Sequence, residues 1–256
     1  MRVPGPRDSK EAADAIAGHP AIRRILDTHR AWIDGGRVLA YKTALELDVA
    51  KHHADSARRT AAQRWCSLVT PVLKAAFTEQ AFSGASACLQ VFGGHGYIRE
   101  SGIEQIVRDS RVSMIYEGTN EIQAIDLLVR KVLADGGSGL AALLLDLRAD
   151  LDATRPADAD VLHRFTQLRY LTAQLVEAAK ADPALPFEAA DDFLRIVALA
   201  LLAWAWAQIE RAAAPGDTRW SAASAALRLR VLPEFDMRIG IIQGQCQPLL
   251  GAGIAL

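Results

Sequence analysis

The chain has 256 residues and 51% of them are hydrophobic, so it is long enough for one or two domains with sizeable cores. A net charge of −1 argues against bulk electrostatic attraction to nucleic acid or to an anionic membrane. The three cysteines, Cys66, Cys88 and Cys246, form no Cys-x-x-Cys pair, and the N-terminus lacks an apolar leader. We therefore expect free thiols, a cytoplasmic protein and no metal site.

Apolar residues at helical spacing predict two long helices in the first part of the chain. The first begins with a proline, a favourable first-turn residue, and covers residues 20–51. The second covers residues 56–92, and Pro71 within it predicts either a kink or a fresh helix start, because a proline inside a helix costs ~3 kcal/mol. Gly93 and Gly94 then end the helix and leave bare backbone that a ligand can approach closely, although a plain helix terminator is the alternative interpretation.

The next segment contains a single carboxylate at a chain reversal. A short helix is predicted over 103–107, and the apolar run 114–116 stops at Glu117 before Thr119 caps a helix that reaches Leu133. Glu117 therefore projects from a junction between elements. We expect its apolar neighbours to desolvate the carboxylate and make it a stronger base, suited to removing a weakly acidic C–H proton. An ordinary exposed turn glutamate is the alternative.

The glycine-rich stretch 134–139 is the best domain boundary, dividing residues 1–136 from 137–256. Further helices are predicted near 138–153, 158–181, 187–212 and 217–247. No strand-like alternation competes, so the predicted fold class is all-α.

The most apolar run, residues 193–209, contains an arginine and is shorter than the ~20 residues that span a bilayer, which favours a buried helix over a membrane span. Trp204, Trp206 and Trp220 are interpreted as core or interface residues, with a binding patch as the less favoured alternative.

Three linked motifs resemble the C-terminal domain of flavin-dependent acyl-CoA dehydrogenases. They are Gln90-Val91-Phe92-Gly93-Gly94-His95-Gly96-Tyr97, Arg108-Asp109-Ser110-Arg111 and Ile115-Tyr116-Glu117-Gly118-Thr119-Asn120-Glu121-Ile122-Gln123. The sequence HGYIRE at residues 95–100 and the long segment after the last motif look most like those of the larger bacterial members, a group that includes enzymes acting on methylthiopropanoyl-CoA. The resemblance implies an antiparallel helical bundle over residues 15–135, followed by the extra helical C-terminal region of that subgroup.

The resemblance also implies a role for each motif. Glu117 matches the catalytic base, which removes the α-proton of an acyl-CoA thioester while a hydride leaves the β-carbon for FAD and a trans-2-enoyl-CoA forms. Gly118 matches a backbone contact to the substrate near the thioester. The adenine-diphosphate end of FAD is matched by Gln90, Val91, Phe92, Gly93 and Gly94, across a subunit interface, and a second flavin contact by Thr119, Asn120, Glu121 and Ile122. Glycines admit a pyrophosphate, and a helix start offers N–H groups to polar cofactor atoms.

Several partners follow from the same resemblance. They are the acyl-CoA substrate, further copies of the chain in a homo-oligomer, and an electron-transfer flavoprotein as electron acceptor. The family's N-terminal helical and β-barrel domains are not found in these 256 residues, and Arg2 and Arg7 do not restore the arginine segment that grips FAD, so a separate chain is expected to supply them. The alternative from another class is a non-enzymatic helical scaffold or truncated remnant that is inactive alone.

Overall fold

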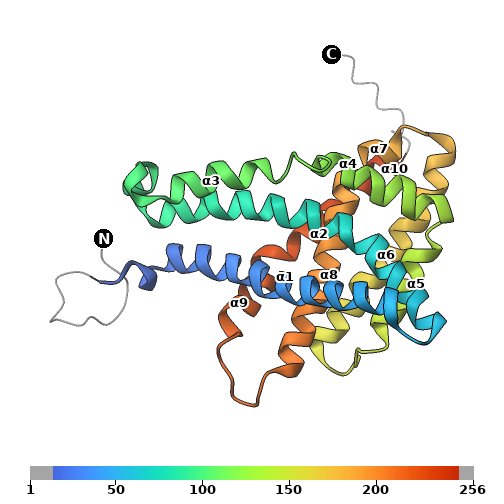
Figure 1. Ribbon diagram of the computed structural model, residues 1–256, viewed down its shortest axis with the longest axis horizontal. Helices are drawn as coiled ribbons and strands as arrows, with labels where there is room; N and C mark the ends of the chain where they lie inside the picture. The colour runs from blue at the N-terminus through green and yellow to red at the C-terminus, as the bar shows by residue number, and fades with distance from the viewer. Residues whose placement is uncertain (1–13, 248–256) are drawn as a thin grey trace.

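The computed structural model describes residues 14–247, which form helices and no strand, so the predicted all-α fold is confirmed over this range (Figure 1). The α-helices are α1 (Pro20–His52), α2 (Ser56–Val91), α3 (Ile103–Val112), α4 (Asn120–Ile125), α5 (Ser138–Arg148), α6 (Pro156–Ala181), α7 (Leu185–Glu188), α8 (Ala190–Ala212), α9 (Ser221–Ala226) and α10 (Pro233–Cys246). The 3₁₀ segments are η1 (Ile16–Gly18), η2 (Gly93–Tyr97), η3 (Arg99–Ser101) and η5 (Leu133–Asp135), and the π-helical segments are η4 (Asp126–Val132) and η6 (Leu227–Val231). Arg2 and Arg7 lie outside the described residues.

The first two helices form a long antiparallel pair that extends beyond the rest of the molecule (Figure 1). We call α3, η2, η3 and the adjoining parts of α1 and α2 the arm. Helix α1 packs against α8 and α9, and α2 packs against α4 and α8. Gly35 makes this packing possible, because a Cβ there would lie 2.5 Å from Leu202 Cδ1 of α8.

The centre of the molecule is α8, in which sixteen residues are buried. Its one arginine in the apolar run, Arg195, is accommodated by a bidentate ion pair with Glu234 (2.8 and 2.9 Å) and by stacking on Trp32. Among residues 14–247, α8 alone has the length and apolar composition of a membrane span, and most of it is buried by the other helices, as predicted. Trp204 and Trp206 are core residues, and the Trp206 indole N–H donates to the carbonyl of Ala31.

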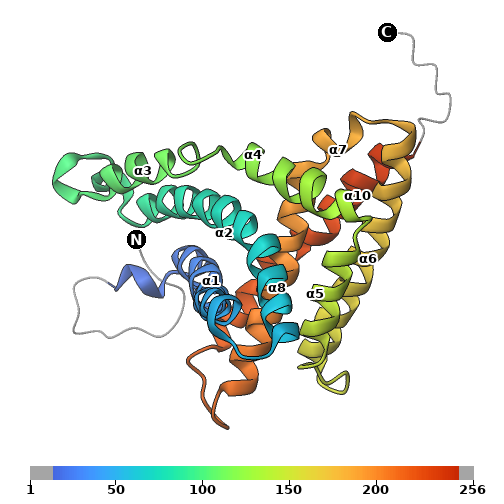
Figure 2. The ribbon, with the colours of Figure 1, turned by 45° about the vertical axis from the view of Figure 1, so that its right-hand side comes forward.

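Pro71 does not start a new helix, since α2 continues through it. The proline lacks an N–H, so the carbonyl of Ser67 four residues earlier has no partner within the helix. Lys131 of η4 donates to that carbonyl at 2.7 Å. Figure 2 shows that α2 changes direction along its length, and the cost of an internal proline is offset by this cross-helix hydrogen bond.

Several predicted helix ends are wrong. The helix predicted over 103–107 extends to Val112, and the one predicted over 138–153 ends at Arg148, before an Asx turn in which Asp152 accepts from the Thr154 N–H. The predicted helix 187–212 is divided into α7 and α8, and the helix that starts at Thr119 becomes π-helical from Asp126. The predicted helix 217–247 is three segments, α9, η6 and α10, with the last beginning at a proline.

One hydrophobic core runs through the described residues on both sides of the glycine-rich stretch. Leu127 and Leu128 of η4 belong to the same cluster as Leu143 of α5 and Leu199 of α8. The division of the chain at residues 136 and 137 stays a prediction.

Candidate functional site

The turn between α3 and α4 presents Glu117 in an unusual backbone conformation. Its φ is +54°, which makes it the one non-glycine residue with positive φ among residues 14–247. A side chain in the left-handed region costs ~1–2 kcal/mol, and such strain is concentrated at functional sites. Gly118 follows with φ +88°, so two consecutive left-handed residues reverse the chain.

Hydrogen bonds inside the turn hold this conformation. The Asn120 N–H donates across the turn to the carbonyl of Met114 at 3.1 Å. The Gln123 side-chain amide donates to the carbonyl of Glu117 at 3.3 Å, and a Cβ on Gly118 would lie 3.1 Å from that same amide nitrogen. Gly118 therefore leaves the room that Gln123 needs to reach the carbonyl of Glu117.

The backbone N–H groups of Glu117 and Gly118 have no acceptor within residues 14–247. Two N–H groups in the first turn of α4 are already used, because Asn120 donates to Met114 and Ile122 donates to the Thr119 hydroxyl at 3.3 Å. Within residues 14–247 the N–H groups of Thr119 and Glu121 also have no acceptor, so the available donors at this point of the chain are those of Glu117 and Gly118 together with these two.

The side chain of Asn120 anchors the turn to α2. Its carbonyl oxygen accepts from the Lys74 ammonium group and from the Thr78 hydroxyl, both at 3.0 Å, and its amide donates to the carbonyl of Ala75 at 3.1 Å. Burial lowers the pKa of Lys74, and the negative charge of Glu117 opposes that shift. Lys74 and Glu117 therefore interact through their opposite charges.

The expected desolvation of Glu117 by its apolar neighbours is not present within the described chain. Glu117 is exposed, and Ile115 and Tyr116 keep 52% and 53% of their surface accessible. Ile122 on the adjoining helix is 48% accessible. Only a further body placed over this turn could exclude water from the carboxylate, since its own neighbours do not cover it.

The predicted cofactor residues fall into two places. Thr119–Ile122 adjoin Glu117, whereas Gln90–Gly94 lie where α2 ends, at the tip of the arm (Figure 1). Helix α3 separates the two places, and its ten residues span about 15 Å. Gly93 has φ +60°, and a Cβ on Gly93 or Gly94 would meet no atom within 4 Å. The tip thus presents open glycine backbone, as the sequence predicts.

The second motif, residues 108–111, supports the turn from α3. The Arg111 guanidinium stacks on the Phe82 ring of α2 and donates to Met114 Sδ at 3.1 Å. A groove of about 660 Å³ between α2 and α3 is lined by this motif and reaches Ile115, two residues before Glu117.

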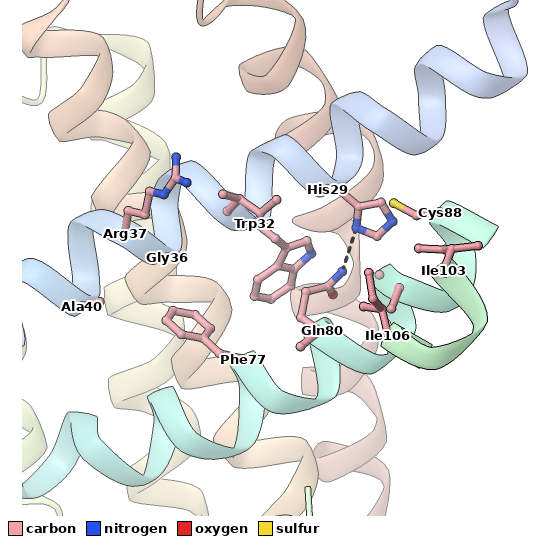
Figure 3. A pocket seen from close by; sticks show the side chains of 14 residues that line it. His29, Trp32, Gly36, Arg37, Ala40, Phe77, Gln80, Cys88, Ile103 and Ile106 are labelled. Carbon is pink, nitrogen blue, oxygen red and sulfur yellow. Dashed lines mark hydrogen bonds between the residues drawn. The ribbon is translucent and has the colours of Figure 1, made fainter. Parts of the chain in front are cut away.

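A second groove, of about 530 Å³, lies between α1, α2 and α3 and is mainly apolar (Figure 3). Trp32 and Phe77 form part of its wall, and His29 and Gln80 point toward one another with their nitrogens 3.4 Å apart. Burial lowers the pKa of His29. Glu117 lines neither groove, so the carboxylate lies on the open surface of the turn. No group of three or more potential metal ligands occurs within residues 14–247.

Sequence reasoning missed Lys74, Thr78 and Gln123. Lys74 interrupts an otherwise apolar stretch of α2, and that interruption is the one signal that could have pointed to it. Its partner is 46 residues away, so the contact depends on the packing of α2 against α4.

Comparisons with known proteins agree on one family. Residues 7–133 match the model of the acyl-CoA dehydrogenase C-terminal domain. The 3-methylmercaptopropionyl-CoA dehydrogenase of Ruegeria pomeroyi is 36% identical over 203 residues, which cover 77% of this chain and 34% of that protein. The broad-specificity linear acyl-CoA dehydrogenase FadE5 of Mycobacterium tuberculosis is 38% identical over 130 residues, covering 49% of this chain and 21% of that protein.

Two solved structures show the same fold over 94% of the chain. They are ACDH-11 of Caenorhabditis elegans in complex with C11-CoA (TM-score 0.67, 20% identity, 42% of that protein covered) and an acyl-CoA dehydrogenase of Bacillus anthracis complexed with FAD (TM-score 0.69, 18% identity, 44% covered). The helices after residue 133 are included in these matches. The chain spans about a third of the length of the Ruegeria enzyme.

Proposed function

The chain belongs to the acyl-CoA dehydrogenase family through its C-terminal domain, and we propose that it supplies the catalytic base for α,β-dehydrogenation of an acyl-CoA thioester. The observation that carries this proposal is the conformation of Glu117. A strained left-handed glutamate with an exposed carboxylate persists only where the surrounding contacts enforce it, and residues strained in this way cluster at functional sites. This observation also favours the enzyme over a non-enzymatic scaffold.

The Glu117 carboxylate takes the proton from the α-carbon of the substrate. This carbon is weakly acidic, so charge that develops on the thioester oxygen must be stabilised as the proton leaves. The N–H groups of Glu117 and Gly118 have no acceptor in the described chain and lie directly beside the carboxylate. A backbone donor at this turn can therefore bind the thioester oxygen while the base works on the adjacent carbon.

Bound FAD would supply the acceptor for the hydride that leaves the β-carbon, and the product would be a trans-2-enoyl thioester. The chain's own residues suit the cofactor at two places. Gly93 and Gly94 present open backbone to the adenine-diphosphate end, because added Cβ atoms there would meet nothing. The side chain of Ile122, half exposed beside Thr119, is available to the other end. About 15 Å of α3 separate these places, which fits a site shared between two copies of the chain.

The activity also requires cover over the exposed turn. A neighbouring domain or a separate chain would bury Ile115 and Tyr116, exclude water and raise the strength of the base. An electron-transfer flavoprotein would reoxidise the cofactor, and the protein would act in the cytoplasm on an acyl-CoA.

The test is anaerobic flavin reduction by acyl-CoA in an assembly that includes the covering domains. Glu117→Gln keeps the size and hydrogen bonding of the side chain but cannot accept a proton, so it should slow reduction by about 10²–10⁴-fold with FAD and acyl-CoA still bound. Glu177→Gln, at an exposed glutamate of α6 outside the predicted site, is the matched control and should change the rate little. Flavin reduction at the parental rate in Glu117→Gln would place the base elsewhere.

A further inference from the structure

Asn120 is the point where the base-bearing turn is fixed to the rest of the molecule. Its backbone N–H closes the turn on Met114, and its side chain makes three contacts with α2. The turn and α2 are far apart in the sequence. These contacts therefore fix the position of Glu117 relative to the bundle.

The two donors to the Asn120 carbonyl oxygen are not equivalent. The Thr78 hydroxyl has one proton, and the backbone carbonyl of Lys74 lies closer to it, at 2.7 Å, than the Asn120 oxygen does, at 3.0 Å. The Lys74 ammonium group has three protons and one acceptor within residues 14–247, Asn120. A charged donor also makes the stronger hydrogen bond. Lys74 is therefore the principal anchor of Asn120.

Lys74 also carries the positive charge that lies near Glu117. Its ammonium group is partly buried and forms no ion pair with a carboxylate within residues 14–247. The carboxylate that acts on it is Glu117, whose charge opposes the effect of burial on the pKa of Lys74. A lysine without an ion-pair partner in the described chain thus places its positive charge beside the turn that carries the exposed Glu117 carboxylate.

We propose that Lys74 is a positioning residue for the base: through its hydrogen bond to Asn120 it fixes the turn 114–120, and its positive charge acts on the Glu117 carboxylate that this turn carries. The description of Glu117 as the base rests on the proposed function. The contact between Lys74 and Asn120 can be measured in the chain without substrate or cofactor. The positioning role of Lys74 can therefore be refuted independently of the role of Glu117 as the base.

The first measurement is hydrogen exchange of the Asn120 backbone N–H, followed by NMR in the 256-residue chain. Lys74→Met keeps the aliphatic stem but removes the donor and the charge, and it should speed exchange by about tenfold. Lys74→Arg should restore most of the protection. Thr78→Val removes the weaker donor and should speed exchange less than threefold. Lys131→Met removes a lysine that contacts Ser67 and Asp126 instead, and should leave the Asn120 amide unchanged.

The second measurement leaves Lys74 in place and follows its ¹³Cε signal with pH. In Glu117→Gln the opposing charge is gone, so the pKa of Lys74 should fall further below its ordinary value. Glu121→Gln should leave it unchanged. The proposal is overturned if the Lys74 titration is the same in both variants, or if Asn120 exchanges at the parental rate in Lys74→Met. Loss of dehydrogenation in Glu117→Gln is a different observation and does not bear on either result.

Discussion

Replacing Glu117 by glycine should leave the chain more stable than replacing it by alanine. Both changes remove the carboxylate, but only glycine relieves the positive φ of +54°. Relief of a left-handed side chain is worth ~1–2 kcal/mol, and the greater freedom of glycine in the unfolded chain subtracts ~0.4–1 kcal/mol. The difference is about 1 kcal/mol in favour of glycine, or about 2–4 °C in Tm for a chain of this size.

The assay is thermal and urea unfolding of the two variants in one buffer, and the control is the same pair of changes at Glu121. That residue has ordinary helical geometry in α4, so glycine should there be less stable than alanine by about 0.5–1 kcal/mol. The two positions should thus give opposite signs. If glycine is the less stable residue at both, Glu117 is not strained and the argument that function retains it loses its physical basis.

Four other outcomes are expected. Gly35→Ala should destabilise the fold by about 1–3 kcal/mol, because the new Cβ would lie 2.5 Å from a leucine of α8, whereas Gly240→Ala, with nothing within 4 Å, should be neutral or stabilising in the same unfolding assay. Burial would raise the pKa of Glu234, but its two arginine partners hold that pKa below its usual range. The resulting contribution to folding stability is present at pH values above the pKa of Glu234 in the unfolded chain and is lost as the pH falls through its pKa in the folded chain. Glu234→Gln should therefore flatten the acid side of the stability curve. Glu79 has its pKa raised by burial, so Glu79→Gln should stabilise the chain at pH 7 and lose that advantage near pH 4, both measured by urea unfolding. The arm leaves large apolar side chains exposed, so the chain should self-associate, and a monomer at every concentration in analytical ultracentrifugation would contradict this.

The helices were predictable where local signals agree with the packing. Pro20 begins α1 and Ser56 begins α2 as the sequence predicts, because the first-turn proline and the Asp55 cap act within a few residues. The continuity of α2 at Pro71 was not predictable. The group that satisfies the freed carbonyl is Lys131, 64 residues away, and no local pattern indicates it.

The candidate site was likewise predictable in part, where the signals are adjacent in the sequence. The junction at Glu117 follows from an apolar run, a Glu-Gly pair and a capping threonine, all adjacent in sequence. The positive φ of Glu117 could not be predicted from the sequence, because Gly118 alone could have adopted the left-handed conformation that reverses the chain. Gln123 explains the difference: its amide reaches back to the carbonyl of Glu117, which selects one of the conformations that the turn could adopt.

The exposure of Glu117 separates two properties that a catalytic base needs. Its orientation is set inside this chain, by Asn120, which is anchored to α2, and by Gln123 of α4. Its desolvation is not, because the apolar side chains of Ile115 and Tyr116 remain open on the surface. Under the proposed function the carboxylate is therefore oriented first and becomes a strong base only when another part of the assembly covers it. That order keeps the chain from burying an ionised carboxylate without a substrate, a state that carries a large desolvation cost.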